Sequence, residues 1–359
     1  MPSFENLFLV ISMSVAATLT GIGGISTFVY AIKRKNNLIF LFSAMWLFYP
    51  FFLGIAATAH FFYSITIMKF FMIPSMIGVP CLIIFIELSR KDRVSAIKLT
   101  ILIILQIILL AIIFLLPASE NFEVIEGFGV HNKGILRIFQ MIYLLYYVPQ
   151  YYLWSFQTWR KSPSQYRSLA RTLIIGTTLF SIVSMIFYVL GTFIRLLNPF
   201  VFLINGIGAF ITTLVILKDP KIMYILPFTA YRILVIETNE GIALFKHDWT
   251  KLEEIEENIF SMVLKAVGSV LDELLKKGSI REIQMDRAVL LIQHDKRYPL
   301  ASILVTSKST KSLRYGLKIF NAEFIAKFYH ENIDFHEVSK FKEADLIVNK
   351  IFDYIPERL

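Results

Sequence analysis

The stretch LTILIILQIILLAIIFLL runs from Leu99 to Leu116, contains no charged residue and stops at Pro117. A bilayer core about 30 Å thick is crossed by roughly 20 helical residues. In lipid, every backbone polar group must find its hydrogen-bond partner within the protein, so a continuously apolar run predicts a helix. We therefore expect a membrane-spanning helix here. The high hydrophobic content of the whole chain, 56%, predicts further membrane-spanning helices.

Apolar runs of similar length recur on both sides of this stretch. Seven occur, at 7–32, 38–60, 70–88, 99–116, 138–159, 172–194 and 196–217. None shows the alternating polarity that strands of a membrane barrel would need. The first is too long for the apolar part of a signal peptide, so we interpret it as a span. Residues 1–220 are thus predicted to form a membrane all-α bundle of seven helices.

The loops between these runs carry their basic residues unequally. One set of loops holds 13 Lys and Arg, and the other holds four, Lys69, Lys133, Arg137 and Arg195. The positive-inside rule places the richer set in the cytoplasm. This predicts a multi-pass protein of the cell membrane with its N-terminus outside and its C-terminus in the cytoplasm.

The formal net charge of +9 follows from this topology. Residues 1–220 contain 16 Lys and Arg against seven Asp and Glu, whereas the remaining 139 residues are neutral, with 20 of each. The basic residues lie in short loops beside the lipid bilayer, which is the expected partner of the apolar spans. We therefore do not expect the chain to bind nucleic acid.

Few polar side chains occur within the predicted spans. The candidates for lining a ligand pocket between the helices are His60, Gln106, Gln140 and Gln150. Hydrogen bonding between helices is an equally good explanation for each of them. The longest outer loop, 117–136, is too short for a folded domain but long enough to contact a solute.

After a connector at 221–228 the pattern changes to that of a small α/β (α+β) domain, residues 229–359. Strands are predicted at 231–238, 242–247, 279–286, 288–294 and 300–307, and helices at 250–278, 310–331 and 336–354. The resulting order is ββαβββαα. Since no helix separates the last three strands, they predict a meander within an antiparallel five-stranded sheet.

Two resemblances follow from this organisation. The order ββαβββαα resembles the longin/roadblock (profilin-like) class, which implies a docking domain for a small GTPase or a similar signalling partner. The bundle, with its short loops and its aromatic-rich segments 47–52 and 143–154, resembles the seven-transmembrane sensor region at the N-terminus of some prokaryotic histidine kinases.

No constellation of catalytic, metal-binding or cofactor-binding residues is visible. His330 and His336 are each followed by Glu, but neither continues into a kinase signature, and no glycine-rich phosphate loop occurs. The histidines lack the spacing of a metal site. We therefore expect a protein that is not an enzyme and that binds no cofactor.

These observations favour an integral membrane receptor that couples a seven-helix bundle to a cytoplasmic docking domain. Two alternatives stay open: a transporter or channel with a regulatory tail, and a membrane anchor for a trafficking or GTPase-regulating module. Whether the chain forms a homodimer is also open.

Overall fold

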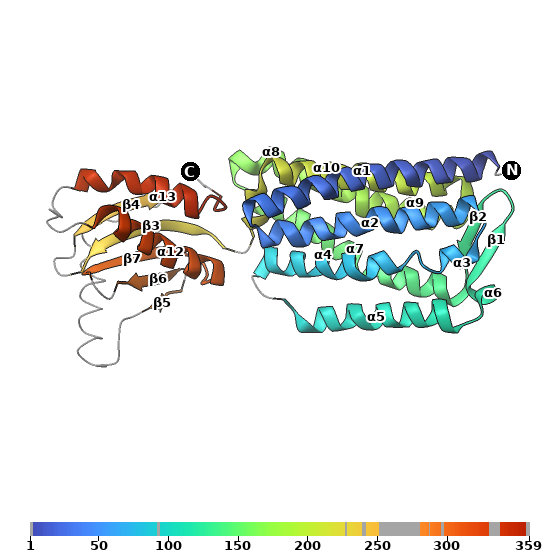
Figure 1. Cartoon of the computed structure of the whole chain (residues 1–359), viewed down its shortest axis with the longest axis horizontal. Helices are drawn as coiled ribbons and strands as arrows, with labels where there is room; N and C mark the ends of the chain where they lie inside the picture. The colour runs from blue at the N-terminus through green and yellow to red at the C-terminus, as the bar shows by residue number, and fades with distance from the viewer. Residues whose placement is uncertain are drawn as a thin grey trace. The chain divides into compact units, whose positions relative to one another are not determined.

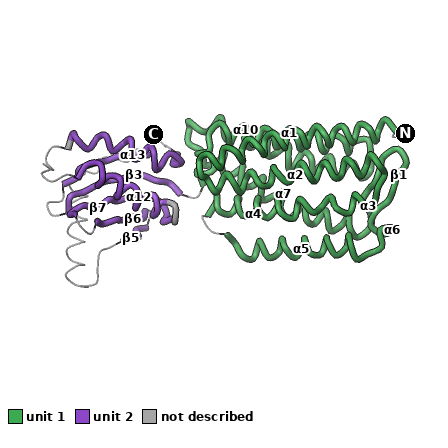
Figure 2. The backbone as a smooth tube through the Cα atoms, viewed as in Figure 1, with its two compact units in different colours: residues 1–226 green, residues 227–359 purple. Residues whose placement is uncertain are grey.

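The structure is a computed structural model that describes residues 3–91, 94–226, 228–238, 242–250, 281–286, 288–295, 298–329 and 338–356. The chain divides into two compact units, Met1–Leu226 (unit 1) and Pro227–Leu359 (unit 2) (Figure 2). Apart from Thr250, the helix predicted at 250–278 lies outside the described residues, as do His330 and His336.

Unit 1 is built from helices that run along a common direction (Figure 1). They are α1 (Phe4–Arg34), α2 (Asn37–Phe61), α3 (Ile65–Met68), α4 (Ile73–Lys91), α5 (Ala96–Leu115), α6 (Ala118–Asn121), α7 (Gly134–Lys161), α8 (Arg167–Thr178), α9 (Ser184–Gly191) and α10 (Asn198–Lys218). A π-helical turn, η2 (Leu179–Val183), joins α8 to α9 without a break, and 3-10 turns η1 (Ser164–Tyr166), η3 (Arg195–Leu197) and η4 (Pro220–Tyr224) lie at helix ends.

Six helical segments among the described residues are long and apolar enough to cross a membrane. They are Phe4–Arg34, Asn37–Phe61, Ile65–Lys91, Ala96–Leu115, Ser164–Gly191 and Arg195–Lys218. The prediction of membrane spans is confirmed for these six. The remaining predicted span falls within α7, whose 28 residues include several tyrosines and glutamines that reduce its hydropathy. A seventh span therefore stays a prediction.

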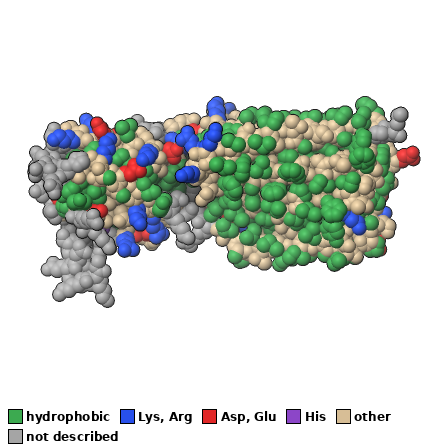
Figure 3. Space-filling model, in the orientation of Figure 1, with side chains coloured by type: hydrophobic (Ala, Val, Ile, Leu, Met, Phe, Trp, Pro, Cys, Tyr) green, Lys and Arg blue, Asp and Glu red, His purple; other side chains and the backbone are tan. Residues whose placement is uncertain are grey.

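The surface of unit 1 is apolar between its two ends. Figure 3 shows hydrophobic side chains over most of the face of unit 1 that is turned to the viewer. Large apolar residues such as Ile25, Ile107 and Leu145 are about half exposed. Such a surface is costly in water but is the expected one for helices that contact lipid.

Small residues bring α1 close to its neighbours α2 and α10 (Figure 1). A Cβ atom on Gly24 would lie 2.5 Å from the carbonyl oxygen of Trp46 in α2. A Cβ atom on Gly206 of α10 would lie 2.7 Å from the Cα atom of Ala16 in α1. Because both neighbours are backbone atoms, only glycine permits these approaches. Close packing by small residues is a common way to hold helices together in a membrane.

Gly24→Ala is expected to destabilise unit 1 by about 1–3 kcal/mol, since α1 and α2 must separate to admit the methyl group. The melting temperature of the purified chain in detergent measures the effect. Gly54→Ala in α2 is the matched control, because no atom lies within 4 Å of the added Cβ. Equal melting temperatures for the two variants would contradict the proposed close packing.

The loop predicted at 117–136 is more ordered than the sequence suggested. It contains α6 and an antiparallel hairpin of β1 (Phe122–Ile125) and β2 (Gly129–Asn132). Gly127 and Gly129 have φ angles of +85° and +88°, which favour glycine. The hairpin lies at the end of the bundle where α1 begins (Figure 1).

Unit 2 contains one five-stranded sheet of order β4-β3-β7-β6-β5, and every neighbouring pair is antiparallel. The strands are β3 (Ala230–Glu237), β4 (Ala243–Asp248), β5 (Glu282–Gln284), β6 (Val289–His294) and β7 (Leu300–Thr306). The predicted five-stranded antiparallel sheet, with its hairpin and its meander, is confirmed.

The C-terminal part of unit 2 packs helices on this sheet. Helix α12 (Lys311–Phe328) contacts β6 and β7, and α13 (Ala344–Ile351) contacts α12 and β4. The 3-10 turn η5 (Val338–Glu343) precedes α13, so the last helix is shorter than the predicted 336–354. The buried rings of Phe320, Phe324 and Phe352 lie in this layer.

Candidate ligand cavity

A cavity of about 230 Å³ lies inside unit 1, between the hairpin and the middle of the bundle. Residues of α1, α2, α4, α7, α9 and α10 form its walls, and residues of β1 and β2 close its end. Asn198 and Asn205 both line it and are seven residues apart in α10. At 1.5 Å per residue, the cavity therefore extends about 10 Å along this helix.

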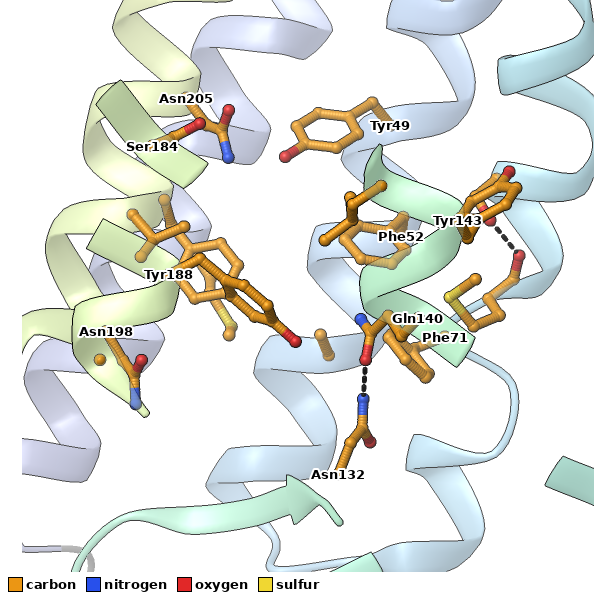
Figure 4. Close-up of a pocket in the computed structure, with 18 of the residues that line it drawn as sticks. Tyr49, Phe52, Phe71, Asn132, Gln140, Tyr143, Ser184, Tyr188, Asn198 and Asn205 are labelled. Atoms are coloured by element: carbon orange, nitrogen blue, oxygen red, sulfur yellow. Dashed lines mark hydrogen bonds between the residues drawn. The ribbon is translucent and has the colours of Figure 1, made fainter. Parts of the chain in front are cut away.

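The wall formed by α7 combines aromatic and amide side chains. Gln140, Tyr143 and Tyr147 line the cavity at helical spacing. The Oε1 atom of Gln140 accepts a hydrogen bond of 2.6 Å from Nδ2 of Asn132 in β2 (Figure 4). The Tyr143 hydroxyl accepts one of 3.0 Å from Nε2 of Gln106 in α5. These bonds fix the orientation of two polar lining side chains.

The opposite wall is formed by α9 and α10. Ser184 and Asn205 lie together across the space from Tyr49, and Tyr188 projects its hydroxyl toward Gln140 and Asn132 (Figure 4). The Oδ1 atoms of Asn205 and Asn132 are buried and have no hydrogen-bond partner among the described residues. Both are available to a bound molecule, because buried polar atoms are otherwise nearly always paired.

The π-helical turn η2 contributes Phe180 and Ser181 to the same wall. A π-helical turn adds one residue to the helical repeat and is frequent at functional sites. Here it precedes α9, so it sets the rotation at which Ser184 and Tyr188 meet the cavity.

Two histidines are in contact where the hairpin packs against α2. The rings of His60 (α2) and His131 (β2) are edge to face, with centroids 5.5 Å apart. The Nε2 atom of His131 donates to the carbonyl oxygen of Phe128, 3.0 Å away. Burial lowers the pKa of His131 below its ordinary value. The hydrogen bond to Phe128 and the charge of Glu123 oppose this shift, whereas the charges of Arg195 and Arg137 add to it. We therefore treat His131 as neutral at pH 7.

Three charged side chains line the cavity, Glu123, Arg137 and Arg195. The Arg195 guanidinium lies 5.9 Å from the centroid of the Phe128 ring. Among the described residues, neither arginine has a carboxylate oxygen within the 4.0 Å of an ion pair. The lining therefore carries a net charge of +1 with its histidines neutral.

The structure separates the four residues predicted to line a pocket. His60 and Gln140 line the cavity. Gln106 does not line the cavity but donates a hydrogen bond to the hydroxyl of Tyr143, which does. Gln150 donates from Nε2 to the carbonyl oxygen of Tyr146, one turn earlier in α7, so its hydrogen bond lies within its own helix. Whether any of the four contacts a ligand stays a prediction.

Most of the polar lining was not predicted. The missed residues include Tyr49, Tyr143, Tyr147, Ser184, Tyr188, Asn198 and Asn205. A signal was present, since Ser181, Ser184 and Tyr188 recur every three to four residues in an apolar span, which places them on one helix face. Asn198 and Asn205 share a face of α10 in the same way.

Acidification is expected to destabilise unit 1 through His131. The unfolded chain binds a proton near pH 6.5 and the folded chain only at lower pH, so stability falls as the pH drops below about 6.5. His60, Glu123, Arg137 and Arg195 are the titratable groups around His131. Melting temperatures at pH 7.5 and pH 5.5 test this, and His131→Gln should shrink the difference. An unchanged difference in that variant would exclude His131 as the cause.

The described residues contain no group of three or more His, Cys, Asp or Glu that could hold a metal ion. Comparison of the chain with family models, with curated proteins and with solved structures gives no match. The case for a function therefore depends on the cavity and on how unit 1 ends. Taken together, six membrane-spanning segments and a five-stranded antiparallel sheet make the chain a membrane protein with an α/β second unit.

Proposed function

We propose that the chain is a membrane receptor whose helical bundle binds a small molecule in the cavity and passes the signal to unit 2. In this proposal α7 is a seventh span, the N-terminus and the hairpin lie outside, and unit 2 lies in the cytoplasm. Unit 2, a longin/roadblock-like domain, then docks a signalling partner such as a small GTPase.

The observation that carries this proposal is the way unit 1 ends. After α10, the residues Ile222, Met223 and Ile225 are at most 2% exposed and belong to the core of unit 1. The Tyr224 hydroxyl donates to Oδ1 of Asn36, 3.1 Å away, and the same oxygen caps α2. The chain therefore leaves the bundle through a packed segment, so a rearrangement of the helices moves the start of unit 2.

The position of the cavity supports the same direction of signalling. Its lining includes Arg195 and Asn198 at the start of α10, whereas unit 1 ends after the other end of this helix. A 21-residue helix is about 30 Å long, which is the thickness of the hydrocarbon core. The cavity and the connector thus lie near opposite faces of the membrane.

The length of α7 supports a seventh span. It has 28 residues, contacts α4, α5 and α8, and ends in Arg160 and Lys161, on the side where the basic loops gather. An odd number of spans places the two ends of unit 1 on opposite sides of the membrane.

Labelling with a membrane-impermeant maleimide tests this topology. Cys81 is the only cysteine, so Cys81→Ser gives a background without thiols. In that background we expect intact cells to be labelled at Glu126→Cys, in the exposed hairpin turn, and not at Tyr315→Cys, 66% exposed on α12. Permeabilised cells should be labelled at both positions. Labelling of Tyr315→Cys in intact cells would reject the proposed topology.

The receptor is distinguished from an anchor by filling the cavity. Ser184→Trp places a bulky side chain in the lining, whereas Ser184→Ala leaves the space open. If the bundle signals to unit 2, hydrogen exchange of η4 and β3 in nanodiscs changes in Ser184→Trp and not in Ser184→Ala. Unchanged exchange in both folded variants indicates an anchor. Uptake of a small solute into proteoliposomes, abolished by Ser184→Trp, would indicate a transporter instead.

A further inference from the structure

We infer that the cavity takes a small organic anion, an apolar body about the size of a phenyl ring that carries one carboxylate. The inference rests on the proposed receptor function and adds the class of ligand. Its basis is the arrangement of charge and polarity along the cavity wall.

The charged residues gather at the end of the cavity that the hairpin closes. Arg195 belongs to η3, just before α10, Arg137 to the first turn of α7, and Glu123 to β1. His131 lies at the same end, close enough to interact electrostatically with all three charged side chains. Because Arg137 and Arg195 lack an ion-pair partner among the described residues, their guanidinium groups are available to an anionic ligand. Arg is the side chain best suited to bind a carboxylate through two parallel hydrogen bonds.

Glu123 is the one lining carboxylate and opposes this charge. It offsets one of the two arginines, which leaves a net charge of +1 at an end of the cavity where Arg195 is exposed and Arg137 and Glu123 are partly buried. A monoanion makes this region neutral, a neutral ligand leaves the charge uncompensated, and a cation raises it to +2. Opposite charges attract and like charges repel, at reduced strength where water reaches them, so the anion is the most favoured of the three and the cation the least.

Further into the bundle the lining becomes aromatic and aliphatic. Phe52, Phe71 and Met72 line this part, and Figure 4 shows the rings of Phe52 and Phe71 beside Gln140. The tyrosine and asparagine side chains add isolated hydrogen-bonding groups but no further charge. Such a wall favours an apolar body with few polar atoms.

The size of the cavity limits the ligand. A volume of 230 Å³ is several times the roughly 30 Å³ share of one water molecule in the liquid, so the cavity has room for a small organic molecule. A phenyl ring with a two-carbon acid, ten non-hydrogen atoms in all, is a molecule of this size. The probe molecules can therefore be small and freely soluble.

A charge series tests the inference with the full chain in nanodiscs. Phenylacetate, 2-phenylethanol and phenethylamine have the same ring and nearly the same size but charges of −1, 0 and +1 at pH 7. We expect phenylacetate to bind at least tenfold more tightly than the alcohol, and the amine to bind most weakly, as measured by saturation-transfer NMR titration. Equal or tighter binding of the alcohol or the amine would overturn the inference.

Two arginine variants locate the anionic group. Arg137→Gln and Arg195→Gln should each weaken phenylacetate binding at least tenfold and leave 2-phenylethanol within twofold. Lys133→Gln is the matched control, since it removes a positive charge near the hairpin from a residue that does not line the cavity. A loss in Lys133→Gln equal to that in the arginine variants would indicate attraction by the overall field only and would overturn the site. The melting temperature of each variant identifies any variant that has not folded. The ligand series on the unmodified chain tests the preference for an anion without any variant.

Failure of this inference is separable from failure of the receptor proposal. Tight binding of phenylacetate without any change in hydrogen exchange of η4 and β3 would support the ligand class and contradict the signalling. An effect of Ser184→Trp on that exchange without selective binding of the anion would contradict the ligand class and support the signalling.

Discussion

Trp154→Ala is expected to lower the free energy of unfolding of unit 1 by about 3–5 kcal/mol. Trp154 in α7 is fully buried, lies nearly parallel to Tyr151 with ring centroids 5.8 Å apart, and meets Phe85 of α4 edge to face at 4.9 Å. Helices inside a membrane gain no hydrophobic energy from pairing, so van der Waals contacts of this kind hold them together. Removing the indole leaves a hole that the surrounding helices fill only in part.

The free energy can be measured by reversible unfolding in mixed detergent micelles. Leu153→Ala is the matched control, because Leu153 is the preceding residue of the same helix but is 44% exposed on the lipid side. We expect the loss for Leu153→Ala to be below about 1 kcal/mol, since little packing is removed. Equal losses for the two variants would show that the ring cluster is not a main source of stability.

The same cluster connects the cavity to the middle of the bundle. Phe180 lines the cavity and meets Trp46 edge to face at 5.1 Å and Tyr151 at 5.8 Å. Trp46 in turn is the residue against which Gly24 of α1 packs. A ligand that displaces Phe180 would therefore move side chains on α2 and α7 directly. This gives the proposed signal a physical route through the first half of the membrane.

Much of the architecture could be predicted because lipid imposes strict rules. Long apolar runs marked the six confirmed spans, and period-two patterns with turn residues marked the five strands of unit 2. The hairpin β1–β2 escaped prediction because its strands have only four residues each and are stabilised by the bundle beneath them. Its two glycines with positive φ were the only local signal.

The cavity could be predicted only in part, for a different reason. Of the one histidine and three glutamines predicted to line a pocket, two, His60 and Gln140, line the cavity. Tyrosine and serine are common in membrane helices, so single residues such as Tyr188 or Ser184 carry little information. Which face of each helix turns toward which neighbour depends on packing across the whole bundle, and one sequence does not encode this in a readable pattern.

Asp248→Ala is expected to destabilise unit 2 by about 3 kcal/mol, the lower end of the range for breaking a buried ion pair. Arg232 of β3 is 7% exposed and lies directly opposite Asp248 of β4. Its Nε and Nη2 atoms donate to Oδ1 and Oδ2 of Asp248, at 2.5 Å and 3.1 Å. Without the carboxylate, a guanidinium would stay buried between strands with no compensating charge. The loss stays at the lower end because the Asp248 side chain is 26% exposed and water reaches it.

Hydrogen exchange of the β3 and β4 amides in the full chain measures this local stability. The double variant Arg232→Met with Asp248→Leu removes both charges and should recover most of the loss, because most of the cost is the unpaired charge and not the missing bond. Lys350→Ala provides the contrast, since its pair with Glu323 is exposed and should contribute less than about 1 kcal/mol. If the double variant were as unstable as Asp248→Ala, the pair itself would be the source of stability.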